Sequence, residues 1–475
     1  MDILQRFCDI QNRRQFLARS GMGLGATALA SSLPGLLAKS KPAINAKAKR
    51  VIFLFMAGGP SQLDLFDYKP NMIKLHGTPL PKEVSGGQRV TAMTKGKAQI
   101  VCSSAFKFSQ HGQSGNHLSE LLPHLSTEID ELCLIKSTHT NAINHDPAQT
   151  FFCTGSEMAG KASMGAWLSY GLGSMNRDLP DFVVLSSAFF SGKVNVQALY
   201  SKLWGNGFLP SKHQGVAFQS TGDPVLFLSN PKGVDREARR KMLDLVTKLN
   251  RNQQNQTMNP EIETSISQQE MAFRMQISVP ELTDFSKENK TVIESYGPEV
   301  HKPGSFASNC LLARRMAERD VRFIQLFHRG WDHHGALPQN LRGQCLDVDQ
   351  PISALLKDLR QRGLLEDTLV VFAGEFGRTT YAQGGANHAN YGRDHHPRCF
   401  TTWMAGAGVK KGLSYGETDE YCYNITKDPV HVRDLHATML HQLGINHQEL
   451  TYPFQGLDQK LTGVEPARVV HDLLI

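Results

Sequence analysis

Short apolar runs, separated by segments with helical patterns, are the feature that most constrains the fold of this chain. The runs occupy residues 51–56, 132–135, 182–185, 321–327 and 369–373. Each run has the length of a buried strand, and several of the intervening segments repeat apolar residues at helical spacing. Strands that alternate with helices through long connections usually pair in parallel. We therefore expect an α/β fold built on a doubly wound, mostly parallel sheet.

The alternation breaks down between residues 186 and 305. Within that stretch, residues 235–250 and 260–277 have a helical pattern but are heavily polar. We interpret the stretch as a helical insertion beside the main sheet. A further helix is expected over residues 117–130, from the spacing of its leucines. The predicted organisation is one α/β domain over residues 51–475 that carries this insertion.

The first 38 residues have the pattern of an export signal. Arg13 and Arg14 precede Phe-Leu, and a glycine-rich, mildly apolar stretch follows. Paired arginines in this context resemble the twin-arginine signal, which passes folded proteins. We predict a signal over residues 1–38, a linker over 39–50, and folded export through the twin-arginine translocase to the periplasm or the medium. No other segment has the length and apolarity of a membrane span, so none is expected in the mature chain.

Charge and cysteine content exclude several other classes of protein. The formal net charge is +7 without any long basic block, which argues against a nucleic-acid partner. Of eight cysteines, Cys8 lies in the predicted signal and the others form no closely spaced pairs. This pattern predicts neither a disulfide framework nor a zinc ribbon.

Three clusters of side chains that can bind metal ions lie in one part of the chain. Asp332 and His334 follow one apolar run, Glu375 follows the next, and Asp394 with His395 precedes a further apolar segment. Polar residues at the C-terminal ends of strands form the sites of open α/β sheets. Carboxylates and imidazoles without thiolates suit a divalent ion. The clusters therefore predict a hydrolytic metal site.

Each cluster also has a purely structural interpretation. The first could be a surface loop with an incidental pair of histidines. Glu375 could form a salt bridge with Arg378 at a turn, and the third cluster could be a polar loop held by Pro397. Alternatively, Arg378 and Arg393 could hold an anionic ester group, because the planar guanidinium matches phosphate or sulfate.

Several motifs together resemble a known family. Residues 322–332, 374–379, 392–395 and 433–438 are similar to the bacterial family called domain of unknown function 1501. The resemblance covers about residues 51–474. It implies a branch of the alkaline phosphatase and sulfatase superfamily, with the fold of that superfamily and metal-dependent hydrolysis of phosphate or sulfate esters.

The order of site residues in that superfamily implies roles for further residues here. Asp64, with Asp67 as an alternative, stands where an acid follows the first strand, and His396 accompanies His395 in the third cluster. The late His436 is more consistent with a structural role. The implied cofactor is one or two divalent metal ions, with zinc, manganese or calcium as candidates.

The nucleophile of that superfamily stands at the start of a helix. Residues 137–145 precede such a helix here, and Thr140 is the preferred nucleophile, with Ser137 and Thr138 as alternatives. His145 in the same loop is a candidate metal ligand. The helix N-terminus would add backbone donors to an anionic ester group.

The sequence departs from the superfamily pattern at three places, one of which is Asp64, which lies eight residues beyond Met56 and thus farther from the first strand than usual. Glu375 and Phe376 stand where relatives have Asp and His, which removes an imidazole, and His334 follows Asp332 by two positions rather than four. These departures favour a rival interpretation, a non-catalytic binding or scaffold protein with a degenerate metal site.

Motifs of other hydrolases are absent from the sequence. It has no Cys-x-Pro-x-Arg, which excludes the formylglycine type of sulfatase, and His-Glu-x-x-His does not occur either. The leading hypothesis is an exported metal-dependent hydrolase of phosphate or sulfate esters. Its expected substrate is an anionic ester, with sulfated or phosphorylated polysaccharide as a candidate.

Overall fold

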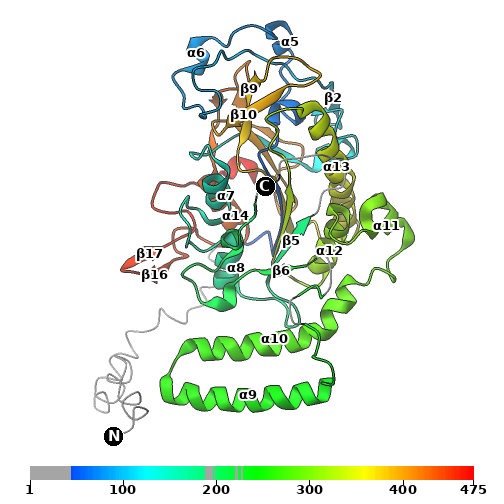
Figure 1. The fold of residues 1–475 in the computed structure, drawn as a ribbon, viewed down its shortest axis with the longest axis vertical. Coiled ribbons are helices and arrows are strands. Elements are labelled where there is room, and N and C mark those ends of the chain that lie inside the picture. The colour runs from blue at the N-terminus through cyan, green and yellow to red at the C-terminus, as the bar shows by residue number, and fades with distance from the viewer. Residues whose placement is uncertain (1–43, 188–195, 197, 220–222, 226–227) are drawn as a thin grey trace.

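A nine-stranded sheet forms the centre of the protein in a computed structural model (Figure 1). The model describes residues 44–187, 196, 198–219, 223–225 and 228–475. The predicted export signal and the first residues of the linker lie outside this described part. The strand order is β12–β4–β11–β8–β1–β7–β5–β6, and β15 also pairs with β4.

All pairings in this sheet are parallel except those of β11, which is antiparallel to β4 and to β8. The expectation of a doubly wound, mostly parallel sheet is thus confirmed, and the five predicted strands correspond to β1, β4, β5, β7 and β8. The strands are β1 (Arg50–Ala57), β4 (Cys133–His139), β5 (Phe182–Ser187), β6 (Val216–Phe218), β7 (Phe323–Arg329), β8 (Thr368–Ala373), β11 (Phe400–Ala405), β12 (Ser414–Tyr415) and β15 (Val430–His431).

Helices cover both faces of the sheet (Figure 1). Alternate residues of β1 point to opposite faces, so that Ile52 and Leu54 belong to one hydrophobic core while Phe53 and Phe55 belong to the other. A strand buried on both sides needs a continuous apolar run, which is why this strand was visible in the sequence. The first core includes α12 (Phe306–Glu318) and α13 (Leu337–Gln361); the second includes α7 (His145–Thr154), α8 (Met164–Leu172) and α14 (Val432–Gln442).

The two polar helices expected between residues 186 and 305 are present. α9 (Arg236–Thr257) and α10 (Pro260–Thr283) form a helical hairpin that projects from the body of the protein (Figure 1). The same stretch is not purely helical, because β6 pairs in parallel with β5 and extends the main sheet. α11 (Lys290–Ser295) then leads back to α12. The single-domain organisation over residues 51–475 stays a prediction.

The helix expected over residues 117–130 is wrong. β3 (Asn116–Ser119) occupies its start and pairs with β2 (Phe108–His111), and a 3₁₀ helix at Leu125–Glu131 follows. Leu118, Leu121, Leu122 and Leu125 are all buried, because a strand and a turn bring them to one core without a continuous helix.

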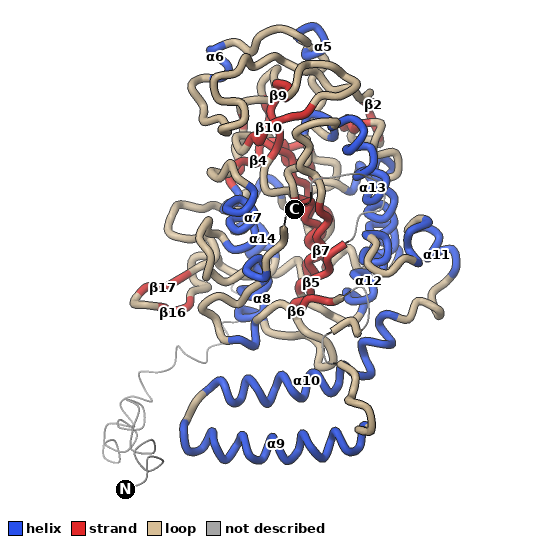
Figure 2. Tube along the Cα trace, in the orientation of Figure 1, coloured by secondary structure: helices blue, strands red, loops and turns tan. Residues whose placement is uncertain are grey.

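A second, two-stranded sheet lies at one end of the central sheet (Figure 2). It consists of β9 (Gly377–Gln383) and β10 (Gly392–His396), which pair antiparallel. The short helices α5 (Met72–Leu75) and α6 (Lys82–Ser85) lie at the same end. Within the described residues no helix combines the length and apolarity needed to cross a bilayer. The remaining elements are α4 (Gln62–Leu65) and the hairpins β13 (Glu417–Thr418) with β14 (Ile425–Lys427) and β16 (Tyr452–Phe454) with β17 (Leu457–Gln459).

Candidate metal centre

Four predicted ligands converge at the C-terminal end of the central strands. His145 opens α7, Asp332 and His334 lie in the loop after β7, and His395 lies on β10. One potential ligand atom from each of the four lies within 4.8 Å of the corresponding atoms of the other three. The structure therefore brings together residues that lie up to 250 positions apart in the sequence, as His145 and His395 do.

Asp332 Oδ1 is the centre of this group. It lies 2.9 Å from His334 Nε2, 3.2 Å from His145 Nε2 and 3.4 Å from His395 Nε2. Arg378 Nη2 donates to the same oxygen at 2.7 Å. Three imidazole nitrogens and a carboxylate oxygen around one point form a donor set that suits a divalent ion.

The second ring nitrogen of each histidine is held by an oxygen acceptor. His145 Nδ1 lies 2.6 Å from Glu375 Oε1, His334 Nδ1 lies 2.5 Å from Gln383 Oε1, and His395 Nδ1 lies 2.8 Å from the carbonyl oxygen of Ile143. An acceptor at Nδ1 favours the tautomer with the proton on Nδ1, and in that neutral tautomer Nε2 offers a lone pair, as in most metal-binding histidines.

His145 Nε2 supports this interpretation independently. It is buried, and it lies 3.2 Å from Asp332 Oδ1 without the alignment of a hydrogen bond. A buried polar atom without a partner is costly, so the arrangement fits a site that is completed by a bound ion.

Two glycines allow the loops of the site to approach closely. Gly58 directly follows β1 and has φ +123°, and a Cβ there would lie 2.6 Å from the backbone nitrogen of Asp332. Gly392 opens β10, where a Cβ would overlap the carbonyl group of His334. Only glycine fits such contacts. Both positions therefore help to hold Asp332 and His334 close to the β9–β10 pair.

Burial and charge tune the ionisable groups of the cluster. Burial raises the pKa of Asp332, but its close contacts with the three histidines and the charge of Arg378 outweigh it and hold that pKa well below its ordinary range. Burial lowers the pKa of His145, yet Asp332 and Glu375 raise it overall. Burial, helped by the charge of Arg378, lowers the pKa of His395 to about 4. Neutral His395 can therefore ligate at neutral pH.

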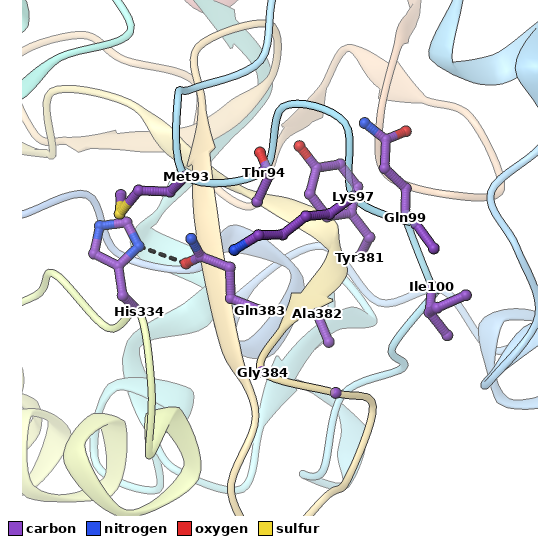
Figure 3. A pocket seen from close by; sticks show the side chains of 12 residues that line it. Met93, Thr94, Lys97, Gln99, Ile100, His334, Tyr381, Ala382, Gln383 and Gly384 are labelled. Carbon is purple, nitrogen blue, oxygen red and sulfur yellow. Dashed lines mark hydrogen bonds between the residues drawn. The ribbon is translucent and has the colours of Figure 1, made fainter.

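The cluster reaches the surface through His334. Its side chain is 20% exposed, against 7% for Asp332. His334 lines a cavity of about 510 Å³ (Figure 3). The cavity lies between β9 and the loop around residue 95, with Met93, Thr94, Lys97, Ala98, Gln99, Ile100, Tyr381, Ala382, Gln383, Gly384 and Gly385 as its other lining residues.

Glu375, which the sequence predicts to be a metal ligand, lies outside the group of four, and its role as a ligand stays a prediction. Its carboxylate accepts hydrogen bonds from the backbone of Gly58 and Gly59, from Gln149 and from His145. Burial alone would raise its pKa, but these donors lower it. With its oxygens occupied, Glu375 lies behind His145 and orients that ring.

Asp64 is not part of the cluster either. It is fully buried and forms an ion pair with Arg393, with Nε 2.8 Å from Oδ2, and it accepts a further bond from Tyr391. Burial raises the pKa of Asp64, and Arg393 more than reverses that shift. The alternative residue Asp67 accepts bonds from Thr418 and Cys422. Both carboxylates have structural partners, which corrects the prediction of Asp64 as a ligand.

Neither predicted arginine is available to an anionic substrate. Both side chains are buried. Arg378 donates to the carbonyl oxygens of Gly58, Gly59 and Arg393 and to Asp332. Arg393 donates to Asp64 and to the carbonyl oxygens of Thr379, Thr380 and Cys102. Their guanidinium donors are used inside the protein, so their predicted role in holding the ester is corrected.

Asp394 also lies outside the cluster, although His395 next to it belongs to it. Adjacent residues of a strand point to opposite sides, and Asp394 accepts hydrogen bonds from Thr91 and Thr94. The prediction of Asp394 as a ligand is corrected for this reason. His396 likewise points away, because its Nε2 lies 2.8 Å from the carbonyl oxygen of Tyr423.

The three candidate nucleophiles differ in their hydrogen bonds. Ser137 donates to the carbonyl oxygen of Asp428, and Thr138 shares a bond with Thr402. The hydroxyl of Thr140 is buried and has no hydrogen-bond partner within the described residues. Of the three, Thr140 is therefore the hydroxyl that no structural contact occupies.

Another group of possible ligands consists of His76, Cys102 and His388. The backbone N–H of Ser103 donates to His76 Nδ1 at 3.3 Å. Burial raises the pKa of the Cys102 thiol to about 11, which disfavours the thiolate that a metal requires. This group is therefore a weaker metal site than the cluster around Asp332.

Sequence reasoning missed Gln383, Gln149 and the carbonyl group of Ile143, which hold the histidines or Glu375. Gln383 stands at the end of β9 and Gln149 lies on α7. A lone glutamine or a backbone carbonyl has no motif of its own. A sequence signal exists only for their partners, the histidines.

Solved structures similar to this chain include phosphatases and sulfatases. A protein of the alkaline phosphatase superfamily from Vibrio parahaemolyticus is 11% identical, with 86% of this chain and 70% of that chain covered and a TM-score of 0.35. A sulfatase from Pseudoalteromonas sp. is 14% identical, with 88% and 71% covered and a TM-score of 0.34. The alkaline phosphatase of the Antarctic bacterium TAB5 is 13% identical, with 76% and 92% covered and a TM-score of 0.30.

Sequence comparison defines the family. No sequence among the curated proteins matches the chain. The model of the family described as "Protein of unknown function (DUF1501)" matches residues 48–474, which is most of the chain and includes all four residues of the cluster. The resemblance of its motifs to this family is thereby confirmed, and the chain belongs to the DUF1501 family.

Proposed function

We propose that this protein is a metal-dependent hydrolase of phosphate or sulfate esters that acts outside the cytoplasm. The observation that carries the proposal is the convergence of three histidine Nε2 atoms on Asp332 while each Nδ1 is held by an acceptor. Histidines that bind metal ions typically have their other ring nitrogen held by an acceptor in this way.

The donor set favours one ion over two. His145, Asp332, His334 and His395 form one group, and the carboxylates of Asp64 and Asp394 are used in other contacts. Three imidazoles and one carboxylate match zinc best among the expected ions. Calcium prefers six to eight oxygen ligands, so this set disfavours it.

The cluster, Thr140 and the neighbouring cavity would each have a part in ester hydrolysis. A bound divalent ion would polarise the ester and neutralise part of its charge. The free hydroxyl of Thr140 is the candidate nucleophile. The cavity beside His334 gives an ester access to the cluster. His145 is held in place by Glu375, and Asp332 by Arg378, so little reorganisation is required.

Elemental analysis of the purified protein tests the metal site. We expect close to one equivalent of zinc or another transition metal, and its loss in His334→Ala. This histidine is partly exposed, so the variant should fold. His124→Ala is the matched control, because His124 is exposed and lies outside the cluster. Metal that stays bound in His334→Ala, or is lost equally in both variants, contradicts the proposal.

Activity assays with p-nitrophenyl phosphate and p-nitrophenyl sulfate distinguish a hydrolase from a binding protein. Turnover by the metal-loaded protein, absent in His334→Ala, supports the hydrolase. Thr140→Ala should reduce kcat by at least about a hundredfold while the metal stays bound, and Thr140→Ser should retain activity. A stoichiometric metal without turnover of any ester favours the rival interpretation, a binding protein.

Export is the remaining part of the proposal. It rests on Arg13, Arg14 and the apolar stretch that follows them. Cell fractionation of the full chain and of a variant with both arginines changed to lysine tests it. Retention of the variant in the cytoplasm supports twin-arginine export. Equal distribution of the two proteins contradicts it.

A further inference from the structure

The cavity beside His334 carries positive charge without an acidic residue to balance it. Lys97 is among its lining residues, and no aspartate or glutamate is. The ammonium group of Lys97 has no hydrogen bond or ion pair with any described residue. In Figure 3 its side chain extends toward Gln383, which holds His334. An unpaired cation in a recess attracts an anion.

Lys97 differs from Arg378 and Arg393 in its accessibility to a substrate. Arg378 and Arg393 are buried, and their donors are bound to carbonyl oxygens and carboxylates of the protein. Lys97 is exposed. Of these three residues it is the one that a substrate anion can reach.

The size and the other lining residues of the cavity indicate what else it accepts. A volume of about 510 Å³ lies within the range of small-molecule sites and far exceeds the volume of a single sulfate or phosphate. Gln383 uses its Oε1 on His334, and this leaves its amide N–H groups to donate. Gln99 adds another amide, while Met93 and Ile100 add apolar contact. Such a lining suits a carrier rich in hydroxyl groups.

We propose that this cavity binds the sugar part of an ester that carries at least two phosphate or sulfate groups. One group lies at the cluster around Asp332, and Lys97 pairs with the second. The position of the first group rests on the proposed hydrolytic function. The position of the second rests on Lys97 alone. Lys97 is thus a residue that determines specificity for doubly charged substrates.

Binding of two matched sugars tests this inference. Titration calorimetry on the metal-loaded protein at fixed ionic strength compares fructose 1,6-bisphosphate with fructose 6-phosphate, which differ by one phosphate. We expect the bisphosphate to bind about three- to fivefold more tightly, as one exposed ion pair allows. Lys97→Met should abolish that preference. Lys95→Met is the control, because Lys95 is also exposed but does not line the cavity.

The outcomes separate this inference from the proposed function. Equal affinity for the two sugars overturns it, as does a preference that survives in Lys97→Met or is lost equally in Lys95→Met. The protein could also bind no metal and hydrolyse neither ester, yet still prefer the bisphosphate through Lys97. That outcome supports the anion site at Lys97 and contradicts the proposed hydrolase function. Metal content of each variant, measured after titration, shows that the cluster itself is unchanged.

Discussion

At the scale of single residues, side-chain direction decides which predicted ligands belong to the site. Asp394 and His395 are neighbours on β10, yet one binds Thr91 and Thr94 while the other faces Asp332. The sequence could not separate them, because a polar segment looks like a loop, and a loop has no fixed alternation of sides. Asp332 and His334 were predictable because they follow an apolar strand.

Glu375 illustrates a residue whose effect on the metal is indirect. We expect Glu375→Gln to weaken metal affinity by about 10- to 100-fold, because His145 Nδ1 loses an anionic acceptor. Competition with a chelator of known affinity measures the change. Gln149→Glu serves as a comparison, since it alters another contact of the same carboxylate. Unchanged affinity in Glu375→Gln would show that the orientation of His145 does not depend on this charge.

A second prediction concerns the contribution of the Asp64–Arg393 ion pair to stability. Both side chains are fully buried. Arg393→Met should lower the free energy of unfolding by about 3–5 kcal/mol, because Asp64 is left as an unpaired buried charge. The double variant Asp64→Leu/Arg393→Met should lose less than the sum of the single variants. Urea unfolding measures these energies. Strict additivity would contradict the ion pair.

At the scale of elements, strands made of apolar residues were predictable from the sequence, and strands made of polar residues were not. β1, β7 and β8 were predictable because helices bury both of their faces. β9 and β10 were missed because buried polar residues such as Arg378, Thr379 and Arg393 form them. Their charges and hydroxyls are satisfied by partners distant in the sequence. A pattern of hydrophobicity along the chain does not contain those partners.

The projecting hairpin of α9 and α10 should contribute little to the core. Leu243 is the buried residue of α9, while Met275, near the end of α10, belongs to the core. Replacement of residues 244–265 by a short linker should change the free energy of unfolding by less than about 1 kcal/mol and leave metal content unchanged. Met275→Ala should instead cost about 2–5 kcal/mol. Similar losses of unfolding free energy in the two variants would contradict the conclusion that the hairpin contributes little to the core.

At the scale of the whole molecule, the fold brings distant segments together to build one site. The α/β class and the strand positions followed from the sequence, since burial of a central sheet needs apolar runs wherever the chain crosses it. The composition of the site did not follow completely. Lys97 comes from a polar segment between α6 and β2, and only the packing of that segment against β9 brings it near His334.

Several histidines far from the metal cluster are buried in the native protein, and this makes stability depend on pH. Burial, with a smaller effect of Lys212, lowers the pKa of His213 to about 4, and burial lowers that of His436 to about 4. Burial and the charge of Arg433 lower the pKa of His431 to about 3. An unfolded chain binds these protons near pH 6.5. The unfolded state therefore gains protons first as pH falls.

Stability should thus be fully present above about pH 6.5 and decrease as pH falls toward about 4. Each such histidine contributes a slope of up to about 1.4 kcal/mol per pH unit. His213→Gln should reduce the slope by that amount, because glutamine can still donate to Ser169, which the Nδ1 of His213 contacts at 2.7 Å. Urea unfolding at several pH values, with chelator present to remove the contribution of metal release, measures the slope. His124→Gln is the exposed control. A His213→Gln profile parallel to that of the wild type would mean that His213 takes up its proton equally in the folded and unfolded states.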